Sequence, residues 1–182
     1  QENLYLAESG SATMLVDGAN SQFSSSRSGF IGTVNGTAAL TFSNGGRGIF
    51  TDQILIGGAN SIITILQGGI LNTQGLSMFS AQANSTIAVD GGNLSLGGGT
   101  TSIGNSTGTG SALMTIDNGG YVSSNYSGSG QFEIGRNGTV NVNQGTFDAN
   151  GRTDVSGGQL HVASGGTFLL DEFRTLNIFG GG

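Results

Sequence analysis

Few side chains in this 182-residue chain could take part in chemistry, and they are widely spaced. The one histidine, His161, lies between Leu160 and Val162, an alternation that places it on the outer side of a β-strand. No HExxH, CxxC or Walker-type motif is present, and the glycine-rich stretches at 97–99 and 104–110 lack the lysine of a phosphate-binding loop. We therefore expect no catalytic and no cofactor-binding residues, and we predict that the protein is not an enzyme.

Carboxylates are the remaining candidates, because enzymes that cleave polysaccharides use pairs of them. Asp171 and Glu172 are adjacent, and a polysaccharide-degrading β-helix enzyme is a third interpretation of the chain. Asp17, Asp90 and Asp117 occupy one position of an internal repeat, where aspartate commonly stabilises a turn by bonding the backbone. Aligned carboxylates can also bind calcium. Calcium at these three aspartates therefore remains an alternative, and we expect no other metal.

The composition favours an ordered and almost uncharged structure. Glycine accounts for 36 residues, charged residues for 9% and hydrophobic residues for 35%, and proline, cysteine and tryptophan are absent. A disordered chain would be poorer in apolar residues and richer in charge. The net charge is −6 and the arginines are isolated, which argues against a nucleic-acid partner. No apolar run approaches the ~18 residues of a membrane span, so we expect no membrane insertion.

One short phrase recurs along the chain: an apolar, a polar and another apolar residue, then a turn and usually two glycines. "ITILQGG" at 63–69 and "MTIDNGG" at 114–120 are two copies. The two apolar residues stand at i and i+2 and so share one face of a β-strand. The second apolar residue of each copy forms a series with intervals of 16 to 27 residues: Val16, Phe42, Ile65, Val89, Ile116, Val142, Val162 and Ile178.

A second short strand is expected before most copies, as in "TSIG" at 101–104, and a third after the glycines, as in "NLSL" at 93–96. Repeats of this length stack so that every strand gains a parallel neighbour one repeat away. We predict an all-β fold, a single-stranded parallel β-helix (β-solenoid) with roughly three faces, and an antiparallel β-sandwich is the alternative. It should have about seven to eight coils of roughly 23–27 residues and a tapered C-terminal end. One domain should span 1–182, with coils that start near residues 4, 30, 54, 76, 101, 132, 153 and 168.

The repeats carry a family resemblance. "ILIGGANSIITILQGG" at 54–69, "TSIGNSTGTGSALMTIDNGG" at 101–120 and "FEIGRNGTVNVNQG" at 132–145 resemble the short repeats of bacterial autotransporter passenger domains and of exported proteins with a PEP-type C-terminal sorting signal. The resemblance implies a β-solenoid, a bacterial origin, and secretion to the cell surface or the extracellular space. The first residue, Gln1, fits a mature secreted protein and equally an excised fragment.

An open solenoid exposes unpaired strand edges at its ends, and such edges invite association. We predict a secreted bacterial structural protein whose partner is itself: it assembles head to tail into an extracellular filament or a fibre of a biofilm matrix. The C-terminal taper is either a cap or a socket for residues 1–6 of the next subunit. The residues expected at the self-assembly interface are Leu4, Tyr5, Leu6, Phe173, Leu176, Ile178 and Phe179.

A second function class remains open. The chain could be a monomeric adhesin or carbohydrate-binding rod, resembling an autotransporter passenger, with extracellular glycans as partners. Such a rod would carry a ladder of exposed aromatic side chains on one face. The three tyrosines, Tyr5, Tyr121 and Tyr126, are too few to predict one.

Overall fold

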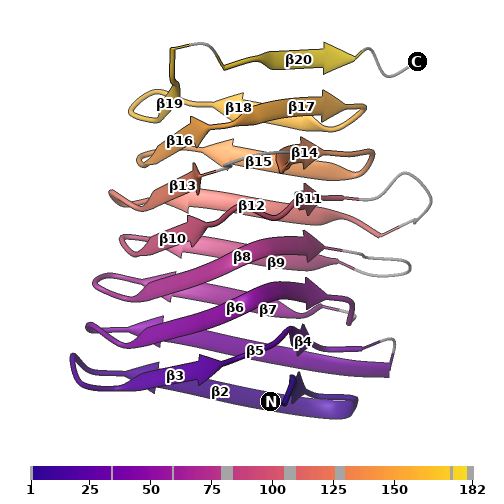
Figure 1. Ribbon diagram of the computed structural model, residues 1–182, viewed down its shortest axis with the longest axis vertical. Helices are drawn as coiled ribbons and strands as arrows, with labels where there is room; N and C mark the ends of the chain where they lie inside the picture. The colour runs from indigo at the N-terminus through magenta and orange to yellow at the C-terminus, as the bar shows by residue number, and fades with distance from the viewer. Residues whose placement is uncertain are drawn as a thin grey trace.

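The structure, a computed structural model, describes residues 2–33, 35–58, 60–78, 84–104, 110–125, 130–172 and 174–179. In these residues the chain forms twenty β-strands and no helix, and the strands within each sheet pair in parallel. Each coil contributes one strand to each of three faces, so the molecule is a β-solenoid, as predicted (Figure 1). The single-stranded parallel β-helix therefore follows from stacking the sequence repeats.

We name the faces by their position in Figure 1. The rear face is the seven-stranded sheet, with β2 (Ser9–Asp17), β5 (Asn35–Ser43), β7 (Ile62–Leu66), β9 (Ser85–Asp90), β12 (Ala112–Asp117), β15 (Gly138–Val142) and β18 (Gln159–Val162). The left face holds β3 (Gln22–Ser25), β10 (Asn93–Leu96), β13 (Tyr121–Asn125), β16 (Thr146–Asn150) and β19 (Thr167–Leu170). The right face holds β1 (Leu4–Leu6), β4 (Gly29–Ile31), β11 (Thr101–Ile103), β14 (Gln131–Ile134), β17 (Arg152–Ser156) and β20 (Leu176–Phe179).

Two long strands join the left and right faces. The first half of β6 (Arg47–Ile56) and of β8 (Ile70–Met78) pairs on the left face, and the second half pairs on the right face. A register shift in β6 between Phe50 and Gln53 marks the corner. The left and right faces therefore form one continuous thirteen-stranded sheet.

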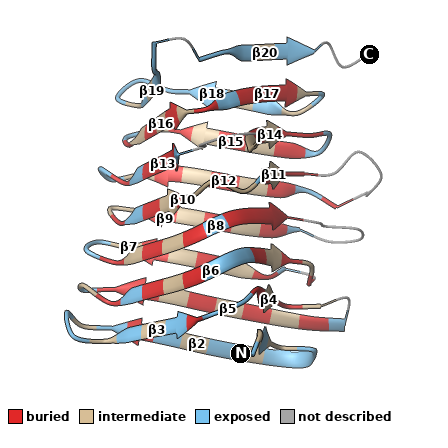
Figure 2. Ribbon diagram, in the orientation of Figure 1, coloured by how far each residue is buried: buried red, intermediate tan, exposed pale blue. Residues whose placement is uncertain are grey.

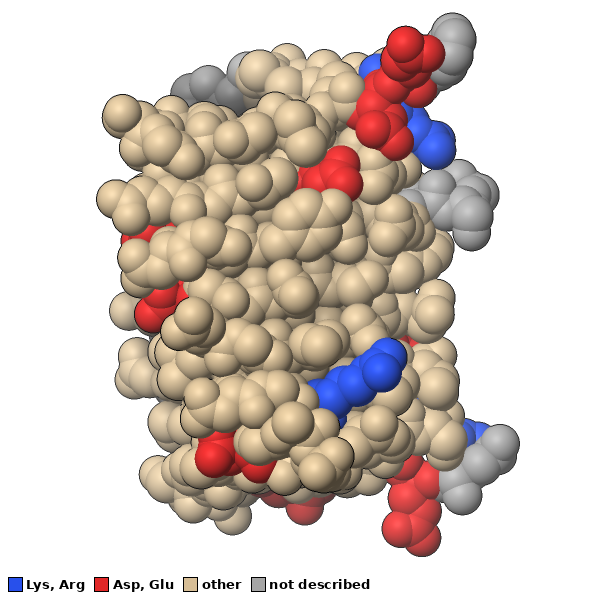
Figure 3. Space-filling view, turned by 90° about the vertical axis from the view of Figure 1, so that its left-hand side faces the viewer, with Lys and Arg blue, Asp and Glu red and all other residues tan. Residues whose placement is uncertain are grey.

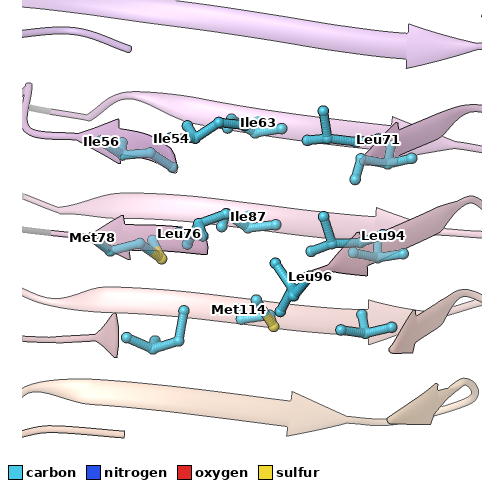
Figure 4. Packing of buried hydrophobic residues seen from close by; sticks show 14 of the residues in the cluster. Ile54, Ile56, Ile63, Leu71, Leu76, Met78, Ile87, Leu94, Leu96 and Met114 are labelled. Carbon is cyan, nitrogen blue, oxygen red and sulfur yellow. The ribbon is translucent and has the colours of Figure 1, made fainter. Parts of the chain in front are cut away.

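Columns of apolar side chains, one residue per coil, fill the interior. On the rear face Ile63, Ile87 and Met114 lie above one another, and Leu71 and Leu94 do the same on the left face (Figure 4). All five are at most 1% exposed. Burying one such side chain contributes about 1.5–3 kcal/mol. Because the columns run from coil to coil, the contacts between coils hold the fold together.

The repeated phrase builds the strands of the rear face. Its first seven apolar anchors, from Val16 to Val162, occupy one continuous inward-facing column. The prediction of an eighth copy is wrong, because Ile178 lies in β20 and pairs on the right face opposite Val155. The rear face thus has seven strands in the described part of the chain and about six full turns, slightly fewer than the seven to eight coils predicted.

In the described residues the C-terminal end carries one strand, β20, beyond the last complete coil. Residues 168–170 were assigned to the start of a coil, but β19 pairs with β16 on the left face, where the third strand of each coil lies. The next coil begins instead with β20 on the right face. The short interval before Ile178 therefore reflects a strand on a different face. The predicted starts from residue 4 to residue 153 fall in strands of the right face.

The double glycines form the corner between the rear and left faces. Gly68 has a φ of +75°, a left-handed conformation that glycine adopts without strain. A side chain on the following Gly69 would clash with the carbonyl oxygen of Phe42 in the preceding coil, and one on Gly46 would clash with that of Val16. The first glycine therefore allows the turn, and the second allows neighbouring coils to approach at the corner.

Candidate functional site at the ends of the solenoid

The two ends of the solenoid carry strand edges that have no partner within the described part of the chain. These edges belong to β18, β19 and β20 at one end and to β1, β2 and β3 at the other. An edge strand presents a row of backbone N–H and C=O groups that can pair with a further strand. The ends are therefore where this fold can accept more polypeptide.

The strands at the C-terminal end, β18, β19 and β20, are largely exposed (Figure 2), which leaves part of the hydrophobic interior uncovered. Ile178 is 74% exposed, although Val155, its neighbour one coil below, is 7% exposed. Val162 is 48% and Leu170 is 40% exposed, and their column neighbours are fully buried. Inward-facing residues of all three faces form this surface, which we call the C-terminal core end: Leu160, Val162, Phe168, Leu170, Leu176 and Ile178.

The N-terminal end continues the same columns but covers them better. Val16 is only 6% exposed, and the other inward side chains are partly buried against the core. On the outer side of β1, Tyr5 stacks on Phe30 of the next coil with ring centroids 4.8 Å apart. We call the inward-facing set the N-terminal core end: Leu4, Leu6, Met14, Val16 and Phe23.

The predicted interface residues lie at opposite ends of the right face. Leu4, Tyr5 and Leu6 form β1, and Leu176, Ile178 and Phe179 belong to β20. Phe173 lies outside the described residues. The two groups are thus not brought together within one chain, and they could meet only across a contact between copies.

The prediction missed the residues that the rear and left faces contribute to these ends. On the rear face these are Met14, Val16, Leu160 and Val162, and on the left face Phe23, Phe168 and Leu170. Their sequence signal is the same i, i+2 apolar pair that marks every strand of the repeat. The pair shows that a strand is present, but it does not show that the strand is the last of its column.

One polar cluster on the right face fastens β20 to the body of the solenoid. Both oxygens of Asp154 bind Arg152, at 2.8 Å from Nη2 and 3.0 Å from Nε, and Asn177 of β20 donates to the same carboxylate at 2.7 Å. Burial alone would raise the pKa of Asp154, but the hydrogen bonds from Arg152 and Asn177 and the charge of Arg152 lower that pKa below its usual value. Asp154 is 4% exposed, so it depends on these partners for its solvation.

The repeat aspartates line the corner between the rear and left faces. Asp17 accepts hydrogen bonds from Ser43 (2.6 Å) and Asn44 (2.8 Å), which lower its pKa. Asp90 and Asp117 lie opposite each other in adjacent coils, and each accepts a hydrogen bond from an asparagine of the next coil. Among the described residues, no group of three or more histidine, cysteine, aspartate or glutamate side chains could hold a metal. Calcium at these aspartates remains a prediction.

The other candidate residues for chemistry lie apart on the surface. His161 is exposed on the rear face, and its Nε2 forms a hydrogen bond of 3.0 Å with Oε1 of Gln159. Asp171 and Glu172 are exposed in the connection between β19 and β20, where the carbonyl of Asp171 accepts a hydrogen bond from the backbone of Arg174. The geometry does not bring these groups together, and the absence of enzyme activity remains a prediction.

Exposed aromatic side chains do not form a ladder in the described residues. Tyr5 is 51% exposed on the right face and Tyr121 is 37% exposed on the left face, whereas Tyr126 lies outside the described residues. Tyr121 donates a hydrogen bond to Asp148, and this bond is the main reason why its pKa is raised to about 12. The feature expected of a carbohydrate-binding rod is therefore not seen.

The side of the molecule seen in Figure 3 is mostly uncharged. Figure 3, which looks onto the left-hand side of Figure 1, shows a neutral surface with few acidic and basic side chains, some of which gather at one corner of the C-terminal end. Within the described ranges, no helix is long and apolar enough to cross a membrane. The two ends, with their free strand edges and exposed apolar residues, are thus the candidate functional site.

Comparison of the chain with protein-family models, with curated proteins and with solved structures found no match in any of the three. The β-solenoid fold is therefore established by the structure itself, and the resemblance to autotransporter passengers and PEP-type exported proteins remains a prediction.

Proposed function

We propose that the protein is a secreted structural subunit that assembles head to tail into an extracellular filament or matrix fibre. The role requires no catalysis and no cofactor. The partner is a second copy of the chain, whose N-terminal end stacks on the C-terminal end of the first. Such a contact joins two different surfaces, so it does not close and generates a fibre.

The observation that carries this proposal is the pairing of the two core ends. Every inward-facing column that opens at the C-terminal core end begins with a strand of the N-terminal core end. On the rear face, for example, the column that starts at Val16 ends at Val162, which is 48% exposed. A second copy placed on this end with its faces aligned continues the column, covers Val162 and pairs the free edge of β18.

The stacked arrangement predicts the dimensions of the fibre. With rear face on rear face, each subunit adds seven strands to that column. At about 4.8 Å per strand, the axial repeat is about 34 Å. The fibre should also diffract at about 4.8 Å along its axis, because all strands lie across it.

Electron microscopy and sedimentation of the purified protein test the proposal. We expect concentration-dependent fibres with the repeat of about 34 Å. The matched variant Val162→Asp places a charge on the C-terminal core end and should remove the fibres. The control Asn141→Asp places the same charge on the outer side of β15, one coil away from this end, and should leave them. Dispersed single particles at high concentration would contradict self-assembly, and glycan binding by such particles would favour the monomeric adhesin.

Secretion is the part of the proposal that rests on the repeats alone. Their resemblance to bacterial exported proteins supports an extracellular or cell-surface location. Fractionation of the source cells with an antibody to the protein tests it. We expect the protein in the medium or on the surface, and retention inside the cells would contradict this location.

A further inference from the structure

The right face has one strand more than the other two faces. In the described residues the rear and left faces each contain seven strand positions, counting the first halves of β6 and β8, whereas the right face contains eight. The additional strand is β20, which stands alone above β17 at the C-terminal end (Figure 1). At the C-terminal end, the right face therefore extends one strand further than the other two faces and forms a step.

This step conflicts with face-to-face stacking of two copies. The free edges of β18 and β19 lie one strand position below that of β20. Pairing both edges requires β2 of a second copy to lie on β18 and β3 to lie on β19. In that position β1 of the second copy falls on β17, where β20 already lies.

β1 and β20 have equivalent places and similar sequences. Leu4 and Leu176 belong to one inward-facing column of the right face, and Leu6 and Ile178 belong to the next. The segments Leu-Tyr-Leu and Leu-Asn-Ile thus present the same apolar pattern to the same positions. On the outer side, Tyr5 of the second copy would take the place of Asn177 opposite Asp154, and both side chains can donate a hydrogen bond.

The two strands differ in how firmly they are held. Ile178 and Phe179 of β20 are 74% and 52% exposed, whereas both leucines of β1 are partly buried and pack on the core. Two residues connect β1 to β2, and five connect β19 to β20. The shorter connection leaves β1 less freedom to move, so β20 is the strand that gives way.

The charged residues that would meet in this contact favour a second copy of the chain as the partner that binds on β17. Glu8 follows β1 by two residues, and in a docked copy it would lie above Gly157, which has no side chain and rests on Arg136. Arg136 lines a hollow of about 330 Å³ at this corner, and its guanidinium forms no ion pair within the described residues. Glu2, which precedes β1, would lie beside Arg152 at the start of β17.

We propose that β20 is an internal substitute for β1 of a neighbouring copy. It covers the docking place on β17, and it detaches when β1 of the next subunit binds there. This inference rests on the proposed head-to-tail assembly and adds its regulation: a subunit with β20 in place is closed to further growth at that end.

Engineered disulfides test whether β20 must detach, since the chain contains no cysteine. Ser156→Cys with Phe179→Cys joins directly paired residues of β17 and β20 and locks β20. Ser77→Cys with Ser102→Cys joins paired residues of β8 and β11 on the same face, away from both ends, and is the matched control. We expect fibres from the control in both redox states. The oxidised β20 lock should give none, and reduction should restore them.

The outcomes separate this inference from the proposed function. If the unmodified protein and both reduced variants form no fibres, self-assembly itself is wrong and this inference falls with it. If the unmodified protein forms fibres and the oxidised β20 lock does so equally well, only the role of β20 is wrong. Loss of fibres with the oxidised control lock as well would show that cross-linking two strands of the right face, and not the attachment of β20, blocks assembly, which also overturns the inference.

Discussion

Thr153 and Thr73 are both buried threonines, but their hydroxyl groups have different surroundings. The hydroxyl of Thr73 lies 2.9 Å from the carbonyl oxygen of Asp52 and 2.8 Å from that of Gly75. The hydroxyl of Thr153 is buried with no hydrogen-bond partner. A buried polar group without a partner costs about 1–3 kcal/mol.

The replacement Thr153→Val should therefore stabilise the protein by about 1 kcal/mol, because it removes an unsatisfied hydroxyl and keeps the shape of the side chain. Thr73→Val is the control and should destabilise the protein by about 1–2 kcal/mol, because it leaves carbonyl groups without a donor. Urea denaturation of the three proteins measures both changes. Equal loss of stability in the two variants would show that Thr153 has a partner in solution.

The attachment of β20 should depend on pH. Hydrogen bonds to the charged form of Asp154 lower its pKa in the folded state. The stabilisation of β20 by the Asp154 carboxylate is therefore fully present above the unfolded pKa of about 4, and it is lost as the pH falls through the lower folded pKa. Hydrogen-exchange protection of residues 176–179 should therefore decrease below about pH 4.

Two variants separate this effect from general acid unfolding. Asp154→Asn should reduce the hydrogen-exchange protection of β20 about tenfold at neutral pH, because it removes the negative charge to which both Arg152 and Asn177 bind. It should also abolish the decrease in protection below about pH 4. Glu133→Gln changes the residue opposite Asp154 one coil below and should leave the pH-dependent decrease in protection unchanged. If that decrease persists in the Asp154 variant, another titrating group controls the attachment of β20.

At the level of strands, the coil could be predicted because each strand carries its own local signal. The apolar pairs of the rear face, from Val16 to Val162, appear in the sequence at regular intervals and lie in one column in the structure. The face of each late strand could not be predicted in this way. The apolar i, i+2 pairs that end in Val162, Leu170 and Ile178 have the same sequence pattern, although they lie on the rear, left and right faces respectively.

The candidate site was predictable only in part for the same reason. The sequence indicated that apolar residues of the first and last strands would be exposed, and this followed from the repeat. The cluster that holds β20 was not predictable, because Asp154 and Asn177 are 23 residues apart and meet only through the register of β17 and β20. That register depends on the whole coil between them.

For the whole molecule, the charge arrangement at the proposed contact between copies gives a test that leaves β20 itself unaltered. Glu8→Arg and Arg136→Glu should each raise the concentration needed for assembly about fivefold, because an exposed ion pair contributes up to ~1 kcal/mol. The two changes together restore opposite charges across this contact and should restore assembly. Arg47→Glu, at the start of β6 on the left face, one coil inside the N-terminal edge, is the control and should have little effect. Sedimentation at several concentrations measures the change, and failure of the double variant to recover would argue against this contact.

The direction of the strands determines how the molecule bears mechanical load. All strands lie across the long axis, so the hydrogen bonds between coils point along it (Figure 1). A tension distributed over both ends of the solenoid loads the hydrogen bonds between coils on all three faces at once. The rod should therefore be stiff. A tension applied to the two chain termini acts on one strand at a time: β20 peels off first, and each further coil of roughly 25 residues then lengthens the chain by about 80 Å. The same fold should thus resist stretching as a rod and unwind in regular steps as a chain.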